Sequence, residues 1–197
     1  MRNTNPLRPG LTMLATAAAV VLIAQSGRAD VKTRIDFDKE FDFKTIQTWA
    51  WNATEAGRVL VARTPDDDPE DIQRRAEPII MSAVEAEMPQ RGLKPARGAP
   101  DAQLTYYLLL TLGSSAQTLG QFLPPVAQWG VPPFRPQTTS LEVIEQGSLV
   151  LDFKAKDQIV WRGVGAAQIE LGLPQEKRVA LIREAVREIL KRYPPKK

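Results

Sequence analysis

Apolar and polar residues alternate with a period of two along two stretches of this chain, 31–38 and 140–153. After a short turn, the apolar stretch 159–169 is predicted to resume the strand. A period of two is typical of a strand with one buried face. Because the last two stretches flank a short polar turn at 154–158, we predict an antiparallel hairpin there.

Two more strands are predicted from residue type. Residues 48–51 are aromatic and favour a strand that places Trp49 and Trp51 on one face. Residues 103–112 form the longest apolar stretch after the N-terminal region, and their Tyr and Thr content favours a central strand over a helix. Residues 52–71 are expected to form a loop.

Helical periodicity appears twice. Between residues 72 and 91 apolar side chains recur at every fourth position, and from Pro174 to Tyr193 they recur at three- and four-residue spacing with charges between them. We expect Pro78 to open the main part of the first helix and Pro89 to end or kink it.

These elements follow the order β-β-α-β-β-β-α. Hairpin-connected strands combined with two amphipathic helices predict an α+β fold. The expected architecture is a mostly antiparallel sheet of about five strands, with both helices on one face.

The N-terminal residues 1–29 have the pattern of a secretory signal peptide. Arg2 and Arg8 precede a short apolar run at 11–24, and small residues precede Asp30. The run is short for a membrane span of about 20 residues, so we predict cleavage after Ala29 and a periplasmic protein, with an uncleaved anchor as the alternative. The remaining 30–197 would form a single domain.

Composition limits the possible functions. The net charge is +3, and since the predicted signal peptide carries three arginines and no acid, the rest of the chain is neutral and does not favour nucleic-acid binding. The chain has no His and no Cys. Disulfides, thiol nucleophiles, lipidation on cysteine, His- or Cys-ligated metals and Ser-His-Asp catalysis are therefore excluded, and we expect neither a cofactor nor an enzyme.

Acidic residues leave one weak catalytic hypothesis. Asp36, Asp38 and Asp42 cluster in sequence and could serve a carboxylate-dependent hydrolase. Strand alternation explains them better, as outward-facing positions beside a buried face. The acidic run at 66–71 lacks the spacing of a calcium loop and instead indicates the start of a helix.

The segment 113–139 differs from the rest of the chain. It is rich in proline, contains Phe122, Trp129 and Phe134, and has Arg135 as its sole charged residue. Aromatic side chains dominate binding energy at interfaces, so Phe122, Trp129 and Phe134 could form a partner-binding loop. Alternatively, the segment folds back and covers the sheet.

Several short motifs resemble a known family. They occupy residues 35–46, 48–51, 147–153 and 160–163, and their order and spacing are similar to those of the bacterial envelope family catalogued as domain of unknown function 4136. The resemblance implies a small exported α+β domain with no established activity, in which Trp161 is a core residue and Asp152 a structural partner near the hairpin turn. Members often carry a lipid on a cysteine, which this chain lacks.

The sequence therefore favours a non-enzymatic binding or assembly module of the cell envelope. Its partner would be an unidentified envelope protein, and contact with the membrane would occur through the N-terminal segment if that segment is retained. The alternative is a carrier of a small apolar ligand or lipid held between the sheet, the helices and the 113–139 segment.

Overall fold

The computed structural model describes residues 31–54, 56–62, 68–111, 117–118, 142–143, 147–169 and 173–196. The strands are β1 (Lys32–Phe37), β2 (Thr48–Trp51), β3 (Gly57–Ala62), β4 (Lys94–Pro95), β5 (Ala102–Thr111), β6 (Gln117–Thr118), β7 (Glu142–Val143), β8 (Gly147–Ala155) and β9 (Gln158–Ala167). The α-helices are α1 (Pro69–Glu87) and α2 (Gln175–Leu190), and short 3-10 helices span Phe43–Thr45 and Met88–Arg91.

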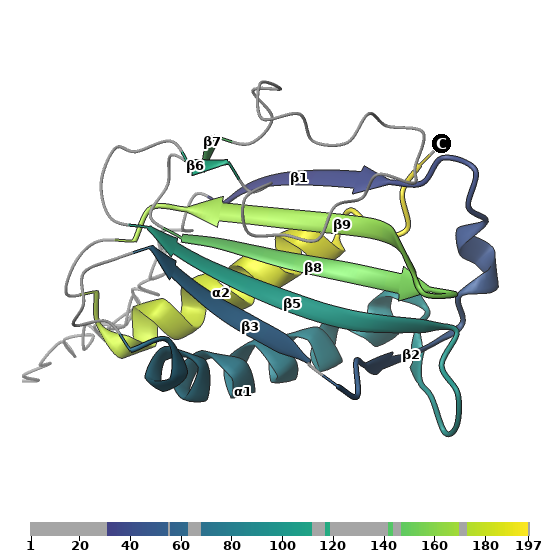
Figure 1. The fold of residues 1–197 in the computed structure, drawn as a ribbon, viewed down its shortest axis with the longest axis horizontal. Helices are drawn as coiled ribbons and strands as arrows, with labels where there is room; N and C mark the ends of the chain where they lie inside the picture. The colour runs from purple at the N-terminus through teal and green to yellow at the C-terminus, as the bar shows by residue number, and fades with distance from the viewer. Residues whose placement is uncertain are drawn as a thin grey trace, which may run out of the picture.

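Seven of the strands form one mixed sheet (Figure 1). Strands β1, β9, β8 and β5 are antiparallel neighbours in that order, and β8 and β9 form the predicted hairpin. On its other side β5 pairs in parallel with both β2 and β3, and β2 pairs in parallel with β4. The expected sheet of five mostly antiparallel strands is thus correct for its antiparallel half and wrong for its parallel half.

Strand β3 lies where the sequence predicts a loop. It is short and its apolar run gives little periodic signal, but it pairs along its whole length with β5, the central strand. Gly57 makes this pairing possible, because a Cβ there would lie 2.0 Å from Cε1 of Tyr106. Tertiary packing against β5 therefore decides the conformation of this segment.

Helix α1 starts earlier than predicted and continues without a break through Pro78. It begins after Asp68, whose side chain accepts a hydrogen bond from the Glu70 amide, and it ends at Glu87, just before Pro89. Pro78 lies inside the helix rather than at its start. Proline costs about 3 kcal/mol in a helix interior, and burial of the apolar face on both sides of Pro78 offsets that local cost.

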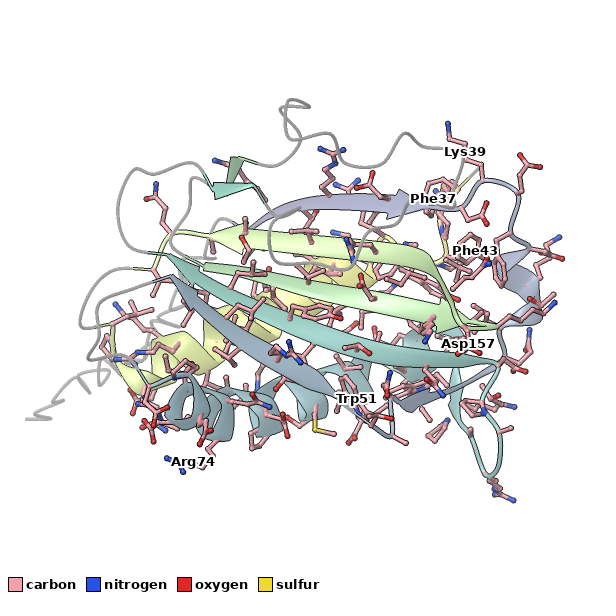
Figure 2. The ribbon with its side chains drawn as sticks, in the orientation of Figure 1. Phe37, Lys39, Phe43, Trp51, Arg74 and Asp157 are labelled. Carbon is pink, nitrogen blue, oxygen red and sulfur yellow. The ribbon has the colours of Figure 1, made fainter. Side chains whose placement is uncertain are left out.

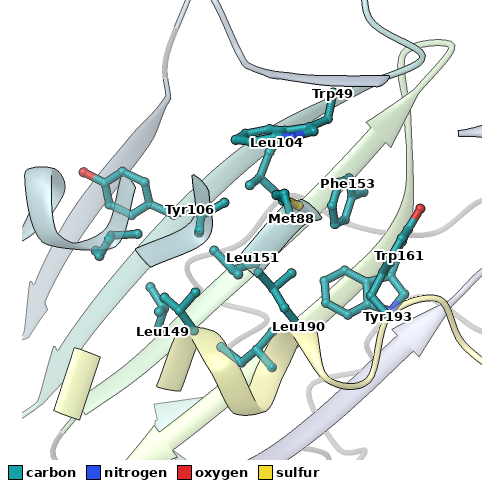
Figure 3. Packing of buried hydrophobic residues seen from close by; sticks show 14 of the residues in the cluster. Trp49, Met88, Leu104, Tyr106, Leu149, Leu151, Phe153, Trp161, Leu190 and Tyr193 are labelled. Carbon is teal, nitrogen blue, oxygen red and sulfur yellow. The ribbon is translucent and has the colours of Figure 1, made fainter. Parts of the chain in front are cut away.

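Both helices pack against the same face of the sheet, as expected (Figure 1). Their apolar faces and the inward residues of the strands form one core, in which Trp161, Tyr106 and Phe153 are the largest fully buried side chains. Trp161 stands edge-on to Phe153, with ring centroids 5.5 Å apart, and Tyr193 stacks on Phe153 at 4.7 Å (Figure 3).

The same aromatic cluster extends towards the start of the chain. The rings of Phe37, at the end of β1, and Phe43 lie 6.1 Å apart and edge-on (Figure 2). Phe43 also contacts Tyr193, with centroids 6.0 Å apart. These contacts hold the connection between β1 and β2 against the end of α2.

Asp101 fixes the start of β5 beside β2. Its carboxylate accepts hydrogen bonds from the Gln47 amide, the Thr48 amide and the Thr48 hydroxyl, at 3.1, 2.8 and 2.7 Å. The hydroxyl bond is the main reason that the pKa of Asp101 lies below its ordinary value, and the two amide bonds add to the effect. The charged form of Asp101 thus favours the folded protein.

We expect Asp101→Asn to lower the stability of the protein near neutral pH. The native pKa is depressed, so the stabilisation is present above the unfolded pKa of about 3.9 and is lost as the pH falls through the native value. The urea midpoints of wild type and variant should therefore differ at neutral pH and converge in acid. Asp38→Asn is the control, because the carboxylate of Asp38 accepts an exposed hydrogen bond from the Glu40 amide. A constant difference at all pH values would contradict the assignment.

Candidate functional site

The predicted partner-binding residues Phe122, Trp129 and Phe134 lie outside the described residues. The two ends of their segment, however, are described. Strands β6 and β7 pair antiparallel, with Gln117 opposite Val143. They lie at the end of the sheet where β5 ends and β8 begins (Figure 1). The pairing of β6 with β7 therefore brings together the residues that flank the 119–141 segment in sequence.

The sheet has a second face, which is turned away from both helices and which we call the outer face. It carries an apolar patch composed of Leu60, Tyr107, Leu109, Val150 and Val164. Three of these, Leu109, Val150 and Val164, are buried and form a cluster separate from the main core. The outer face is thus apolar at its centre and is not a simple solvated surface.

A row of four polar residues crosses the outer face beside the apolar patch. The strand register aligns Asp36 on β1 with Arg162 on β9, Arg162 with Asp152 on β8, and Asp152 with Thr105 on β5. We call this the polar row. At its β1 end, Asp36 also lies 3.6 Å from Nη2 of the exposed Arg34. The row places one cation between two carboxylates.

Asp152 and Arg162 form a buried, two-pronged ion pair. Nε of Arg162 donates to one carboxylate oxygen and Nη2 to the other, both at 2.7 Å, and both side chains are at most 3% exposed. Burial raises the pKa of Asp152 more than the Arg162 charge lowers it. Burial alone would lower the pKa of Arg162, but the charge and hydrogen bonds of Asp152 outweigh this and raise it. The guanidinium therefore keeps its charge.

This ion pair links β8 to β9 on the outer face of the sheet. The buried carboxylate and guanidinium occupy each other's hydrogen-bonding positions, as a bidentate pair does. The prediction that Asp152 is a structural partner near the hairpin and that Trp161 is a core residue is confirmed.

The three acidic residues of the hydrolase hypothesis have separate surroundings. Asp36 belongs to the polar row, whereas the side chain of Asp38 accepts from the Glu40 amide and that of Asp42 from the Lys44 amide. Within the described residues, acidic side chains form no group of three that could hold a metal ion. Neither described helix has the length and apolar character needed to cross a bilayer.

Sequence reasoning missed the polar row, although each member is visible in the sequence. A two-residue turn at Lys156 and Asp157, both with positive φ, would place Asp152 opposite Trp161 if the hairpin were regular. A register shift between Phe153 and Lys154 places Asp152 opposite Arg162 instead. A β-bulge of this kind changes which side chains share a face, and the alternating pattern does not reveal it.

Two helices on one face of a mixed sheet make this an α+β domain, and the polar row lies on the opposite face of the sheet. The family described as Domain of unknown function (DUF4136) matches residues 33–195. The chain belongs to this DUF4136 family, as its motifs suggest, and no curated protein matches it.

Similar solved structures include a DUF4136 family protein from Bacteroides thetaiotaomicron VPI-5482, with 18% identity and a TM-score of 0.46, covering 83% of this chain and 96% of that one. A PDZ domain protein from Parabacteroides distasonis ATCC 8503 has 13% identity and a TM-score of 0.47, with 86% of this chain covered. This chain spans 38% of that protein's length. The PelC dodecamer from Paraburkholderia phytofirmans has 11% identity and a TM-score of 0.34, and the match covers 82% of this chain and 96% of the PelC chain.

Proposed function

We propose that this DUF4136 protein is a non-enzymatic binding or assembly module of the bacterial cell envelope. Its partner-binding element would be the 113–139 segment, with Phe122, Trp129 and Phe134 as the anchoring side chains. Large aromatic residues supply much of the energy of protein interfaces, and prolines reduce the conformational entropy that a segment loses on binding.

The observation that carries this proposal is the pairing of β6 with β7. It joins the two ends of the segment at one end of a sheet whose strands β5 and β8 are long and extensively paired. Binding residues on a loop held by a rigid scaffold are a common arrangement in proteins. This pairing supports the proposal that the segment is a loop with fixed ends.

Export to the periplasm is part of the proposal. Strand β1 begins at Lys32, shortly after the proposed cleavage site at Ala29. Cleavage there would therefore leave every described helix and strand intact. The mass of the protein purified from the periplasm tests this directly, since the proposed mature protein begins at Asp30.

A photo-crosslinking residue at Trp129 tests the binding function in intact cells. We expect one envelope protein to be the main adduct, and we expect its yield to fall severalfold when Phe122 and Phe134 are both replaced by alanine, because interface aromatics contribute disproportionately to affinity. The matched control places the crosslinking residue at Asp157, an exposed turn residue in the β8–β9 hairpin.

The outcomes separate the candidate functions. The same adducts from Trp129 and Asp157, or an adduct that persists without Phe122 and Phe134, would contradict a specific interface in this segment. Co-purification of a lipid or small apolar molecule, in the absence of a protein adduct, would instead favour the carrier.

A further inference from the structure

We propose that strand β1 pairs with the β1 strand of a second copy of this chain. The two strands would run antiparallel about a two-fold axis at Ile35, and the two seven-stranded sheets would become one continuous sheet. The inference goes beyond the proposed function and does not depend on the 113–139 segment, because the residues that carry it belong to β1 and to the elements beside it.

Strand β1 is the end strand of the seven-stranded sheet (Figure 1). Within the described part of the chain, β9 is the one strand that pairs with β1, and this pairing is regular over all six residues of β1. The strand also contains no proline. A regular edge strand without proline presents a row of amide and carbonyl groups that another strand can bind.

The hydrogen bonds to β9 determine which residues of β1 present these groups. The Asp38 amide donates to the Val160 carbonyl at 2.9 Å, so the even-numbered residues of this segment point their backbone groups towards β9. Thr33, Ile35 and Phe37 alternate with them, and their amides and carbonyls point away from β9. An incoming antiparallel strand must therefore form its hydrogen bonds with these three residues.

Charge selects one register for two copies of this strand. If Ile35 lies opposite Ile35 of the second copy, Thr33 lies opposite Phe37, and all three outward-pointing residues are hydrogen-bonded. Arg34 then lies directly opposite Asp36, and the two-fold axis produces this contact twice. A shift of two residues, the smallest that keeps the hydrogen bonds, places either Arg34 opposite Arg34 or Asp36 opposite Asp36. Facing unlike charges stabilise a strand pair and facing like charges destabilise it, so charges that hinder pairing with other edges make β1 complementary to itself in one register.

The side chains at this edge also suit a second copy. Arg34 and Asp36 are 45% and 28% exposed and lie 3.6 Å apart, so pairing would join two such ion pairs into a group of four alternating charges. On the helix side, Ile35 and Phe37 are partly buried at the margin of the main core, and facing β-branched and aromatic residues stabilise paired strands. Helix α2 packs more closely against β9 than against β1, which places the helix one strand in from the edge.

Single engineered cysteines test the register, because the chain has no cysteine of its own. An equal mixture of the Arg34→Cys and Asp36→Cys proteins is expected to form the mixed disulfide in severalfold excess over both homodisulfides, beyond the statistical ratio. In the proposed register the two positions face each other with Cα atoms about 4.5 Å apart, which a disulfide spans. Each position lies about 7–8 Å from its own copy across the diagonal. Lys156→Cys, in the exposed β8–β9 turn, measures disulfides formed by random collision.

The molar mass of the purified protein tests the pairing itself. Light scattering during size-exclusion chromatography is expected to give the mass of two chains, which falls towards one chain on dilution. Arg34→Asp places carboxylates opposite each other at both contacts and should raise the dissociation constant about tenfold or more. Arg74→Asp is the matched control, because it makes the same change of charge at an exposed position on α1 and should leave the dimer intact.

Results of three kinds would overturn the inference. A mass of one chain at every concentration would show that the edge does not pair with a second copy. A statistical yield of the mixed disulfide, or a yield that Lys156→Cys matches, would reject the register. An unchanged dissociation constant for Arg34→Asp would show that the dimer forms through another surface. None of these results depends on the adduct from Trp129, so this inference and the proposed function can fail separately.

Discussion

Asp152→Leu is expected to lower the free energy of unfolding by about 3–5 kcal/mol, because it leaves the guanidinium of Arg162 buried without its carboxylate. Nε and Nη2 of Arg162 both lose the carboxylate oxygens to which they donate at 2.7 Å in the wild type. Asp36 is the next carboxylate along the polar row, but its side chain is 28% exposed. It therefore compensates the buried charge less well than Asp152 does.

A second substitution separates the cost of an unpaired, buried Arg162 from the cost of losing the ion pair itself. Adding Arg162→Met to Asp152→Leu removes the unpaired cation, and apolar replacement of a buried ion pair is often neutral or stabilising. We therefore expect the double variant to recover most of the stability. Urea unfolding of the wild type, the single variants and the double variant measures this cycle. Equal instability of Asp152→Leu and the double variant would contradict the account.

The two single variants should also differ in their response to pH. Arg162→Met leaves Asp152 buried without its cation, and burial raises the pKa of that carboxyl. An acid with a raised native pKa destabilises the folded state above that pKa, and the penalty is relieved as the pH falls through it. Arg162→Met should thus regain stability relative to wild type on mild acidification, whereas Asp152→Leu should not, because arginine stays charged.

Trp161→Ala is expected to cost about 3–5 kcal/mol, the usual range for deleting a large buried aromatic side chain. Trp161 is fully buried and contacts both Phe153 and Tyr193 edge-on, with centroids 5.5 Å away in each case. Its surroundings are tight, because a Cβ on Gly163 would lie 2.4 Å from Cη2 of the indole. The cavity left by alanine has little room to collapse.

Trp161→Phe provides the matched comparison. It keeps an aromatic ring in the cluster and removes less volume, and the indole Nε1 has no hydrogen-bond partner among the described residues. No hydrogen bond to a described residue is lost, so the cost should be well below that of alanine. Thermal unfolding of both variants tests this order. Equal costs for phenylalanine and alanine would show that packing of the indole does not stabilise this end of the core.

The sequence predicts the helices and strands that bury one side, because burial on one side gives their apolar residues a regular spacing. The hairpin, β1 and α2 have long repeats of apolar positions, and the structure confirms them. Strand β3 and the interior position of Pro78 are different, because contacts distant in sequence determine them: pairing with β5 in one case and the packed face of α1 in the other. Local patterns carry little information about such contacts.

The candidate site shows the same division. Asp152 and Trp161 could be identified as structural from their motif, but the alignment of Asp152 with Arg162 depends on the register shift beside Phe153. The pairing partner is thus a property of the bulge and not of the alternating pattern. The partner-binding role of Phe122, Trp129 and Phe134 remains a prediction. In the described structure, strands β6 and β7, which flank their segment, pair with each other.

The central claim, a binding module that acts through Phe122, Trp129 and Phe134, is tested most directly by titrating the purified mature protein with the envelope protein captured from Trp129. We predict saturable binding that weakens about tenfold or more when Trp129 is replaced by alanine, with an unchanged thermal midpoint. Lys156→Ala, in the hairpin turn, should bind as the wild type does. Equal affinity of wild type and Trp129→Ala would contradict the account.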